Sequence, residues 1–92
     1  MNKAEALKLF EEVQTKQGEH NGRWEDECNQ EYSSEIYLAE MVSYAEFLEI
    51  EFDKDPESYR ENEDDHDYMV WDQMGFEIKT LIDKKLRDII LD

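Results

Sequence analysis

The chain has 92 residues, of which 26 are acidic and 10 are Lys or Arg, so its formal net charge is −16. Such a charge repels nucleic acid and anionic lipid, so direct nucleic-acid binding is not expected. No apolar run approaches the ~20 residues that span a bilayer, so membrane insertion is not expected either. Two Trp, five Tyr and four Phe distinguish the chain from a disordered acidic segment and predict one small folded domain over residues 1–92.

The first predicted helix covers residues 3–17. Asn2 followed by Glu5 resembles a capping box, and apolar residues then recur at helical spacing, namely Leu7, Phe10 and Val13. Gly18 and the pair Asn21-Gly22 predict that this helix ends in a loop. One or two helical turns are expected next, because an apolar or aromatic residue recurs at every fourth position, at Trp24, Cys28 and Tyr32.

The second predicted helix is long, over residues 35–53, and Ser33 or Ser34 suits its N-terminal cap. Its apolar stripe comprises Leu38, Met41, Ala45, Leu48 and Phe52. Asp55-Pro56 predicts its end, because the residue before proline avoids helical angles. The same pair suits the cap and first turn of a following element.

The third predicted helix covers residues 66–90, with apolar residues at helical spacing: Trp71, Met74, Ile78, Leu81, Ile82, Leu86, Ile89 and Ile90. Gly75 inside it favours a close helix approach or a kink. No segment alternates with period two, so we predict an all-α fold of three main helices in a small acidic single domain. A homodimer would enlarge its modest core, and we expect the interface on the terminal helices, where Ile and Leu accumulate after residue 77.

The negative charge is concentrated in the middle of the chain. Residues 1–18 carry three acids and three bases, residues 19–67 eighteen acids and three bases, and residues 68–92 five acids and four bases, giving 0, −15 and −1. Adaptation to high salt, or solvation alone, would spread acid over every exposed surface. A surface for a basic partner is therefore the favoured interpretation, with a plain solvated surface as its alternative.

Several chemistries lack their residue pattern. No calcium loop fits from Asp53 or Glu61, a single Glu63-x-x-His66 is half of a di-iron motif, and two His with one Cys do not make the usual zinc sites. No metal, cofactor or catalytic residue is predicted, and no nucleophile motif or glycine-rich phosphate loop indicates an enzyme. A magnesium-dependent nucleotide pyrophosphatase using Glu46-x-x-Glu49 and Glu61-x-x-Asp64 on facing helices is the enzymatic alternative.

The central acids have a spacing that suits imitation of DNA. Duplex DNA presents one charge per ~1.7 Å of axis, and carboxylates three or four residues apart on a helix lie about 5–6 Å apart. Rows of this kind are Glu27, Glu31 and Glu35, then Glu46, Glu49 and Asp53, and a third can be formed by Glu61, Asp64 and Asp65. The predicted partner-binding carboxylates are Glu25, Asp26, Glu27, Glu31, Glu35, Glu40, Glu46, Glu49, Asp53, Asp55, Glu61, Glu63, Asp64, Asp65 and Asp67.

In size, acidity, helical pattern and lack of catalytic motifs, the chain resembles the small DNA-mimic proteins of bacteriophages, and most closely the Arn family of anti-restriction nuclease proteins of T-even phages. The resemblance implies a DNA-shaped acidic dimer that inhibits a host restriction nuclease of the McrBC type and engages a nucleoid protein such as H-NS. Anti-CRISPR inhibitors share the same character. An acidic adaptor that binds through apolar helix faces is the remaining alternative.

The single Cys28 cannot form an intramolecular disulfide, and residues 1–13 lack the continuous apolar segment of a signal peptide. A cytoplasmic location is therefore expected, in the host cell if the protein is phage-encoded. Five aromatic residues lie among the acids and serve either core packing or partner contact: Trp24, Tyr32, Tyr37, Tyr44 and Tyr59.

Overall fold

A computed structural model describes the backbone of residues 1–92 and every side chain except that of Glu27. The order of elements is α1 (Lys3–Trp24), the 3-10 helix η1 (Glu27–Asn29), α2 (Gln30–Phe47), the 3-10 helix η2 (Pro56–Tyr59) and α3 (Asp67–Leu91). The part of the chain that the structure describes contains no strand, so the predicted all-α fold with three main helices is confirmed.

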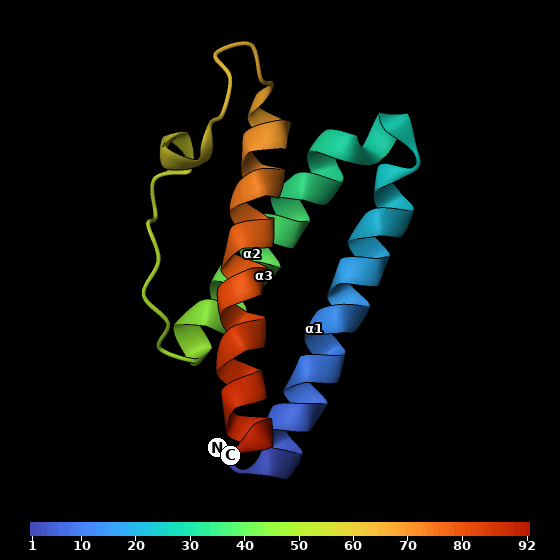
Figure 1. Cartoon of the computed structure of the whole chain (residues 1–92). Coiled ribbons are helices and arrows are strands. Elements are labelled where there is room, and N and C mark those ends of the chain that lie inside the picture. The colour runs from blue at the N-terminus through green and yellow to red at the C-terminus, as the bar shows by residue number, and fades with distance from the viewer.

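The helices pack side by side, and both termini lie at the same end (Figure 1). The pairs His20 with Asp72 and Gln14 with Asp83 show that α1 and α3 are antiparallel. In contrast, α2 and α3 run in the same direction, because Tyr37 lies against Gly75 and Leu48 against Lys85. Residues 48–66 therefore return the chain along the outside of the bundle before α3 begins (Figure 1).

Helix α1 begins as predicted and ends later. Asn2 Oδ1 accepts from the Glu5 amide at 2.8 Å and Glu5 Oε1 accepts from the Asn2 amide at 3.3 Å, which is the capping box. The predicted end at residue 17 is wrong, since the helix continues through Gly18 and Gly22 to Trp24. Its last two turns bury His20, and this packing outweighs the roughly 1 kcal/mol that each glycine costs a helix.

Helix α2 was predicted with wrong boundaries at both ends. Ser33 and Ser34 are not caps. They are fully buried residues inside the helix, and the helix begins at Gln30. The helix stops at Phe47 and not near Asp53. There, the Ile50 amide donates to the Ala45 carbonyl at 2.9 Å and the Glu49 amide to the Glu46 carbonyl at 3.1 Å. This is a Schellman motif in which Glu49, with φ 58°, takes the left-handed position usually held by glycine.

Helix α3 matches its predicted range to within one residue at each end and supplies much of the core. Tyr37, Met41 and Ala45 of α2 pack with Ile78, Ile82 and Leu86 of α3, and Ala6 and Val13 of α1 complete the cluster. A Cβ on Gly75 would lie 2.7 Å from Cδ2 and Cε2 of Tyr37, so the close approach predicted for this glycine is confirmed. Leu7 and Leu81, which belong to the predicted apolar stripes, are 47% and 40% exposed.

Candidate functional site

The connection between α2 and α3, residues 48–66, is the most acidic part of the molecule, and we call it the acidic strap. It contains nine carboxylates and two basic residues, Lys54 and Arg60. It runs from the end that holds both termini to the opposite end, along one side of α3 (Figure 1). Its carboxylates are therefore distributed along the length of the bundle.

Arg60 organises the second half of the strap. Its Nε and Nη2 bind the two carboxylate oxygens of Glu57 at 2.6 and 3.0 Å, and its Nη1 donates to the carbonyl of Asp65 at 2.5 Å. Nη2 also reaches Asp67 at 3.0 Å. The hydrogen bond from Arg60 lowers the pKa of Glu57. One guanidinium thus holds η2 against the start of α3 and fixes the loop between them.

The first half of the strap is held by hydrogen bonds to backbone and side-chain oxygens. Tyr59 Oη donates to the Asp53 carbonyl at 2.7 Å, and Asp55 Oδ1 accepts from the Glu57 amide at 3.0 Å. Asp55-Pro56 therefore begins a new element, as predicted, although α2 ends before it. Hydrogen bonds from Ser58 and from the Asp55 amide lower the pKa of Asp53. Together with the bond from Arg60 to the Asp65 carbonyl, these bonds hold the backbone of the strap in place.

A second group of acids lies on α2 and on the turn that precedes it. Glu31 and Glu35 are exposed and one helical turn apart, while Glu25 and Asp26 occupy the turn. Of the predicted row over residues 27–35, the side chain of Glu27 lies outside the described residues. The row of Glu46, Glu49 and Asp53 does not exist as a helical row, because α2 ends at Phe47 and only Glu46 lies on it.

Two predicted carboxylates form ion pairs within the molecule. Glu40 lies 3.3 Å from Lys16 Nζ and 3.9 Å from Arg23 Nη2, and Asp67 lies 3.0 Å from Arg60 Nη2. Asp65, which is half-buried, accepts from the Asn62 amide at 3.1 Å. The remaining predicted side chains that the structure describes are exposed: Glu25, Asp26, Glu31, Glu35, Glu46, Glu49, Asp53, Asp55, Glu61, Glu63 and Asp64.

A buried polar cluster between the three helices was not predicted. His20 Nδ1 lies 2.8 Å from Ser33 Oγ, and His20 Nε2 contacts Asp72 Oδ1. Arg23 Nε, which can only donate, binds the same Ser33 Oγ at 3.1 Å. Ser33 can donate to Nδ1 while the Nε2 proton points to Asp72, whereas the buried Nη2 of Arg23 has no hydrogen-bond partner among the described residues. Because 13 and 52 residues separate these side chains from His20, only the folded topology brings them together.

His20, Ser33 and Asp72 are the residue types of a Ser-His-Asp triad, but Ser33 cannot meet a substrate. The Ser33 side chain is 0% exposed, the residue lies within α2, and its Oγ already accepts a hydrogen bond from Arg23 Nε. The cluster therefore fastens α1 to α2 and α3. A metal site is equally unsupported by geometry, since the described residues contain no group of three His, Cys, Asp or Glu able to hold an ion.

The carboxylates required by the pyrophosphatase alternative do not lie on facing helices. Glu46 is in the last turn of α2 and Glu49 lies beyond it, in the left-handed position. Glu61 and Asp64 belong to the strap, close to the start of α3. Since α2 ends at the end of the bundle where the strap begins, the two pairs are separated along the bundle (Figure 1).

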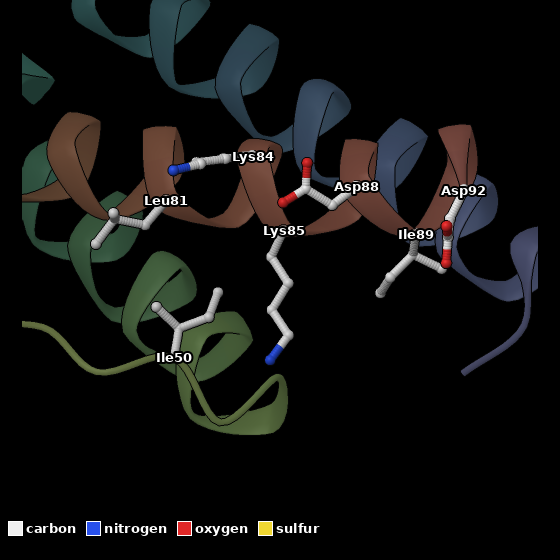
Figure 2. Close-up of a pocket in the computed structure, with 7 residues that line it drawn as sticks. All are labelled: Ile50, Leu81, Lys84, Lys85, Asp88, Ile89 and Asp92. Carbon is white, nitrogen blue, oxygen red and sulfur yellow. The ribbon is translucent and has the colours of Figure 1, made fainter.

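An apolar groove lies at the end of the molecule that carries both termini. It has a volume of about 570 Å³ and is lined by Ile50, Leu81, Ile89, Lys84, Lys85, Asp88 and Asp92. Figure 2 shows Lys85 extending from α3 toward the loop of Ile50, and its Nζ donates to the Leu48 carbonyl at 2.7 Å. At the same end of the bundle, the side chain of Phe47 is 69% exposed.

Comparison of the chain with protein-family models, curated proteins and solved structures finds no match. Among the described residues, no helix combines the length and apolar character needed to cross a bilayer. The geometry of the acidic surface and of the groove therefore carries the functional interpretation.

Proposed function

We propose that this protein is a DNA-mimic inhibitor that occupies the DNA-binding surface of a basic host protein in the cytoplasm. The target class that we favour is a restriction nuclease of the McrBC type, with a nucleoid protein of the H-NS type as a further partner. The observation that supports this proposal is the acidic strap, whose nine carboxylates are distributed along the bundle and whose backbone is held by Tyr59 and Arg60.

The dimensions of the molecule agree with this role. Its extents are 42 × 26 × 17 Å, and the longest corresponds to about 12 base pairs at 3.4 Å each. Carboxylates carried by a backbone segment that is held in place lose less conformational entropy on binding than those of a flexible tail. A strongly negative surface also steers a basic partner and accelerates association.

We propose further that a second copy of the chain covers the apolar groove. Leu81 and Ile89 line it, and Lys84 and Lys85 border it. The exposed Phe47 is flanked by Glu46 and Glu49, which complement Lys84 and Lys85 in charge, although Asp88 and Asp92 line the same groove. A two-fold axis would place the Phe47 region of each copy on the groove of the other, so one surface supplies both halves of the contact. The proposed interface lies on the terminal part of α3, where the sequence also predicts it.

The proposed inhibition can be tested with a McrBC-type nuclease and a modified duplex substrate. We expect inhibition that weakens steeply as salt rises, and binding that excess duplex DNA displaces. A strap variant, Glu61→Gln/Glu63→Gln/Asp64→Asn, should weaken binding. Its matched control, Glu11→Gln/Glu19→Gln/Glu77→Gln on α1 and α3, removes the same charge from exposed positions outside the strap and the groove and should have a smaller effect. Equal losses in the two variants would mean that net charge, not the strap, determines binding, and binding that DNA cannot displace would refute mimicry.

The proposed dimer can be tested separately by sedimentation velocity. Leu81→Glu should produce a monomer, whereas Tyr32→Glu, which alters a 62% exposed side chain far from the groove, should not. Lys84→Glu should weaken the dimer and Glu46→Lys in the same chain should restore it. A wild-type monomer at tens of micromolar would contradict the proposed interface.

A further inference from the structure

A second hollow lies between the last turns of α1 and the first half of α3. It has a volume of about 290 Å³ and is lined by His20, Asn21, Trp24, Glu25, Asp72 and Phe76. This volume is at the lower limit of about 300–1,000 Å³ for ligand pockets, so it suits one long side chain and not a helix. The hollow lies at the end of the bundle where the strap meets α3.

The walls of the hollow are aromatic and held in place. Trp24 Nε1 donates to Ser34 Oγ at 3.0 Å, and its ring lies 5.9 Å from that of Tyr68. The ring of Phe76 lies 5.5 Å from Tyr37 and 6.2 Å from His20, yet Phe76 remains 38% exposed. Two aromatic residues therefore reach a surface cavity in orientations fixed by the core beneath them.

The charge of the hollow is negative. Its lining includes the carboxylates of Glu25 and Asp72 and no Lys or Arg. Asp72 is positioned by His20 Nε2 through Oδ1, and its side chain is 18% exposed. Arg23, the nearest base along α1, is engaged with Ser33, Glu19 and Glu40. Aromatic walls beside carboxylates are the combination that attracts an organic cation.

We infer that this hollow receives an arginine side chain from the basic partner, an inference that rests on the proposed function. A guanidinium is planar and weakly hydrated, stacks on aromatic rings and pairs with carboxylates through its fork of N–H donors. The strap and α2 then supply the long-range attraction, while the hollow supplies one buried anchor contact. Such anchors, in pockets that exclude water, contribute a large share of binding energy at protein interfaces.

The probe is the peptide acetyl-Gly-Arg-Gly-amide, compared with the same peptide carrying citrulline, which keeps the shape and removes the charge. We expect the arginine peptide to cause a saturable shift of the Trp24 indole N–H signal in NMR spectra, larger than that of Trp71, and the citrulline peptide to cause none. Phe76→Leu and Glu25→Gln should each weaken peptide binding about 3- to 10-fold, as loss of a cation–π or charge-assisted contact requires.

The matched control is Glu11→Gln, which removes one exposed carboxylate of α1 and should leave the peptide affinity unchanged. Glu25 is exposed, so Glu25→Gln reports binding even if Phe76→Leu loosens the fold. Equal effects of Glu25→Gln and Glu11→Gln, or equal shifts with both peptides, would overturn the inference. If both hollow variants bind the nuclease as tightly as the wild type, and DNA still displaces it, the anchor fails and the mimic proposal stands. If the arginine peptide binds the hollow but DNA displaces no bound partner, the mimic proposal fails and the hollow remains an arginine site.

Discussion

Replacement of Gly75 by alanine tests the packing between α2 and α3. The new Cβ would lie 2.7 Å from two ring carbons of Tyr37, so the ring or the helices must move by most of an ångström to restore van der Waals contact. The ring cannot yield easily, because it is fully buried, stacks on His20 at a centroid distance of 4.3 Å and is tied through its hydroxyl to Gln17.

Two opposing terms determine the size of the effect. Overpacking of a core costs about 1–3 kcal/mol, whereas exchanging glycine for alanine in a helix gains about 1 kcal/mol. We expect Gly75→Ala to lower the free energy of unfolding by up to about 2 kcal/mol. For a domain of this size the melting temperature falls by about 4–8 °C per kcal/mol.

Gly18 and Gly22 provide matched controls, because a Cβ at either position meets no atom within 4 Å. Gly18→Ala and Gly22→Ala should therefore show only the helix gain and raise stability by up to about 1 kcal/mol each. Urea unfolding followed by circular dichroism measures all three variants. Tyr37→Leu should make Gly75→Ala less costly in the double variant than alone. A Gly75→Ala protein as stable as the Gly18→Ala protein would refute the close approach of the helices.

Three further predictions concern the helix end, the strap and the buried tyrosines. Glu49→Gly should raise the melting temperature, because glycine adopts the left-handed angle at no steric cost, and Glu49→Ala, which keeps that cost, should not. Arg60→Ala should make residues 53–66 sensitive to limited proteolysis while the helical circular dichroism signal persists, and loss of the helical signal would show that Arg60 supports the whole fold. Burial raises the pKa of Tyr37 and Tyr44 above the ordinary 10.0, so the unfolded chain ionises first and stability should fall as pH rises above about 10. The Tyr37→Phe/Tyr44→Phe variant should show a shallower fall in urea unfolding at pH 9 and pH 11, and an equal slope would contradict this assignment.

Local signals predicted those parts of the fold that local interactions determine. The capping box at Asn2 and the whole of α3 follow from neighbouring residues and from an uninterrupted apolar stripe. The end of α1 could not be predicted this way, because its last turns are held by His20 and Trp24 through contacts with α2. Gly18 and Gly22 lie on the exposed face, where their usual meaning as helix breakers is overridden by that packing.

The end of α2 and the candidate sites depended still more on tertiary structure. Glu49 in a left-handed conformation carries no sequence signature, since glycine is the residue that normally indicates a Schellman motif. The sequence shows that acid is concentrated in residues 19–67, but it does not predict how the strap is arranged around Arg60. Similarly, Trp24 and Phe76 are separated by most of the chain and meet at a hollow only because α1 and α3 are antiparallel.

The parallel course of α2 and α3 also gives the molecule an electrical polarity. The aligned peptide units of each helix leave roughly half a positive charge at its N-terminus and half a negative charge at its C-terminus. Both N-termini point to the end that carries Glu31 and Asp67 in their first turns, and both C-termini point to the end where Lys85 binds the Leu48 carbonyl. The helix dipoles of α2 and α3 therefore add, the antiparallel α1 offsets one of the two, and the net dipole favours acid at the end where α2 and α3 begin.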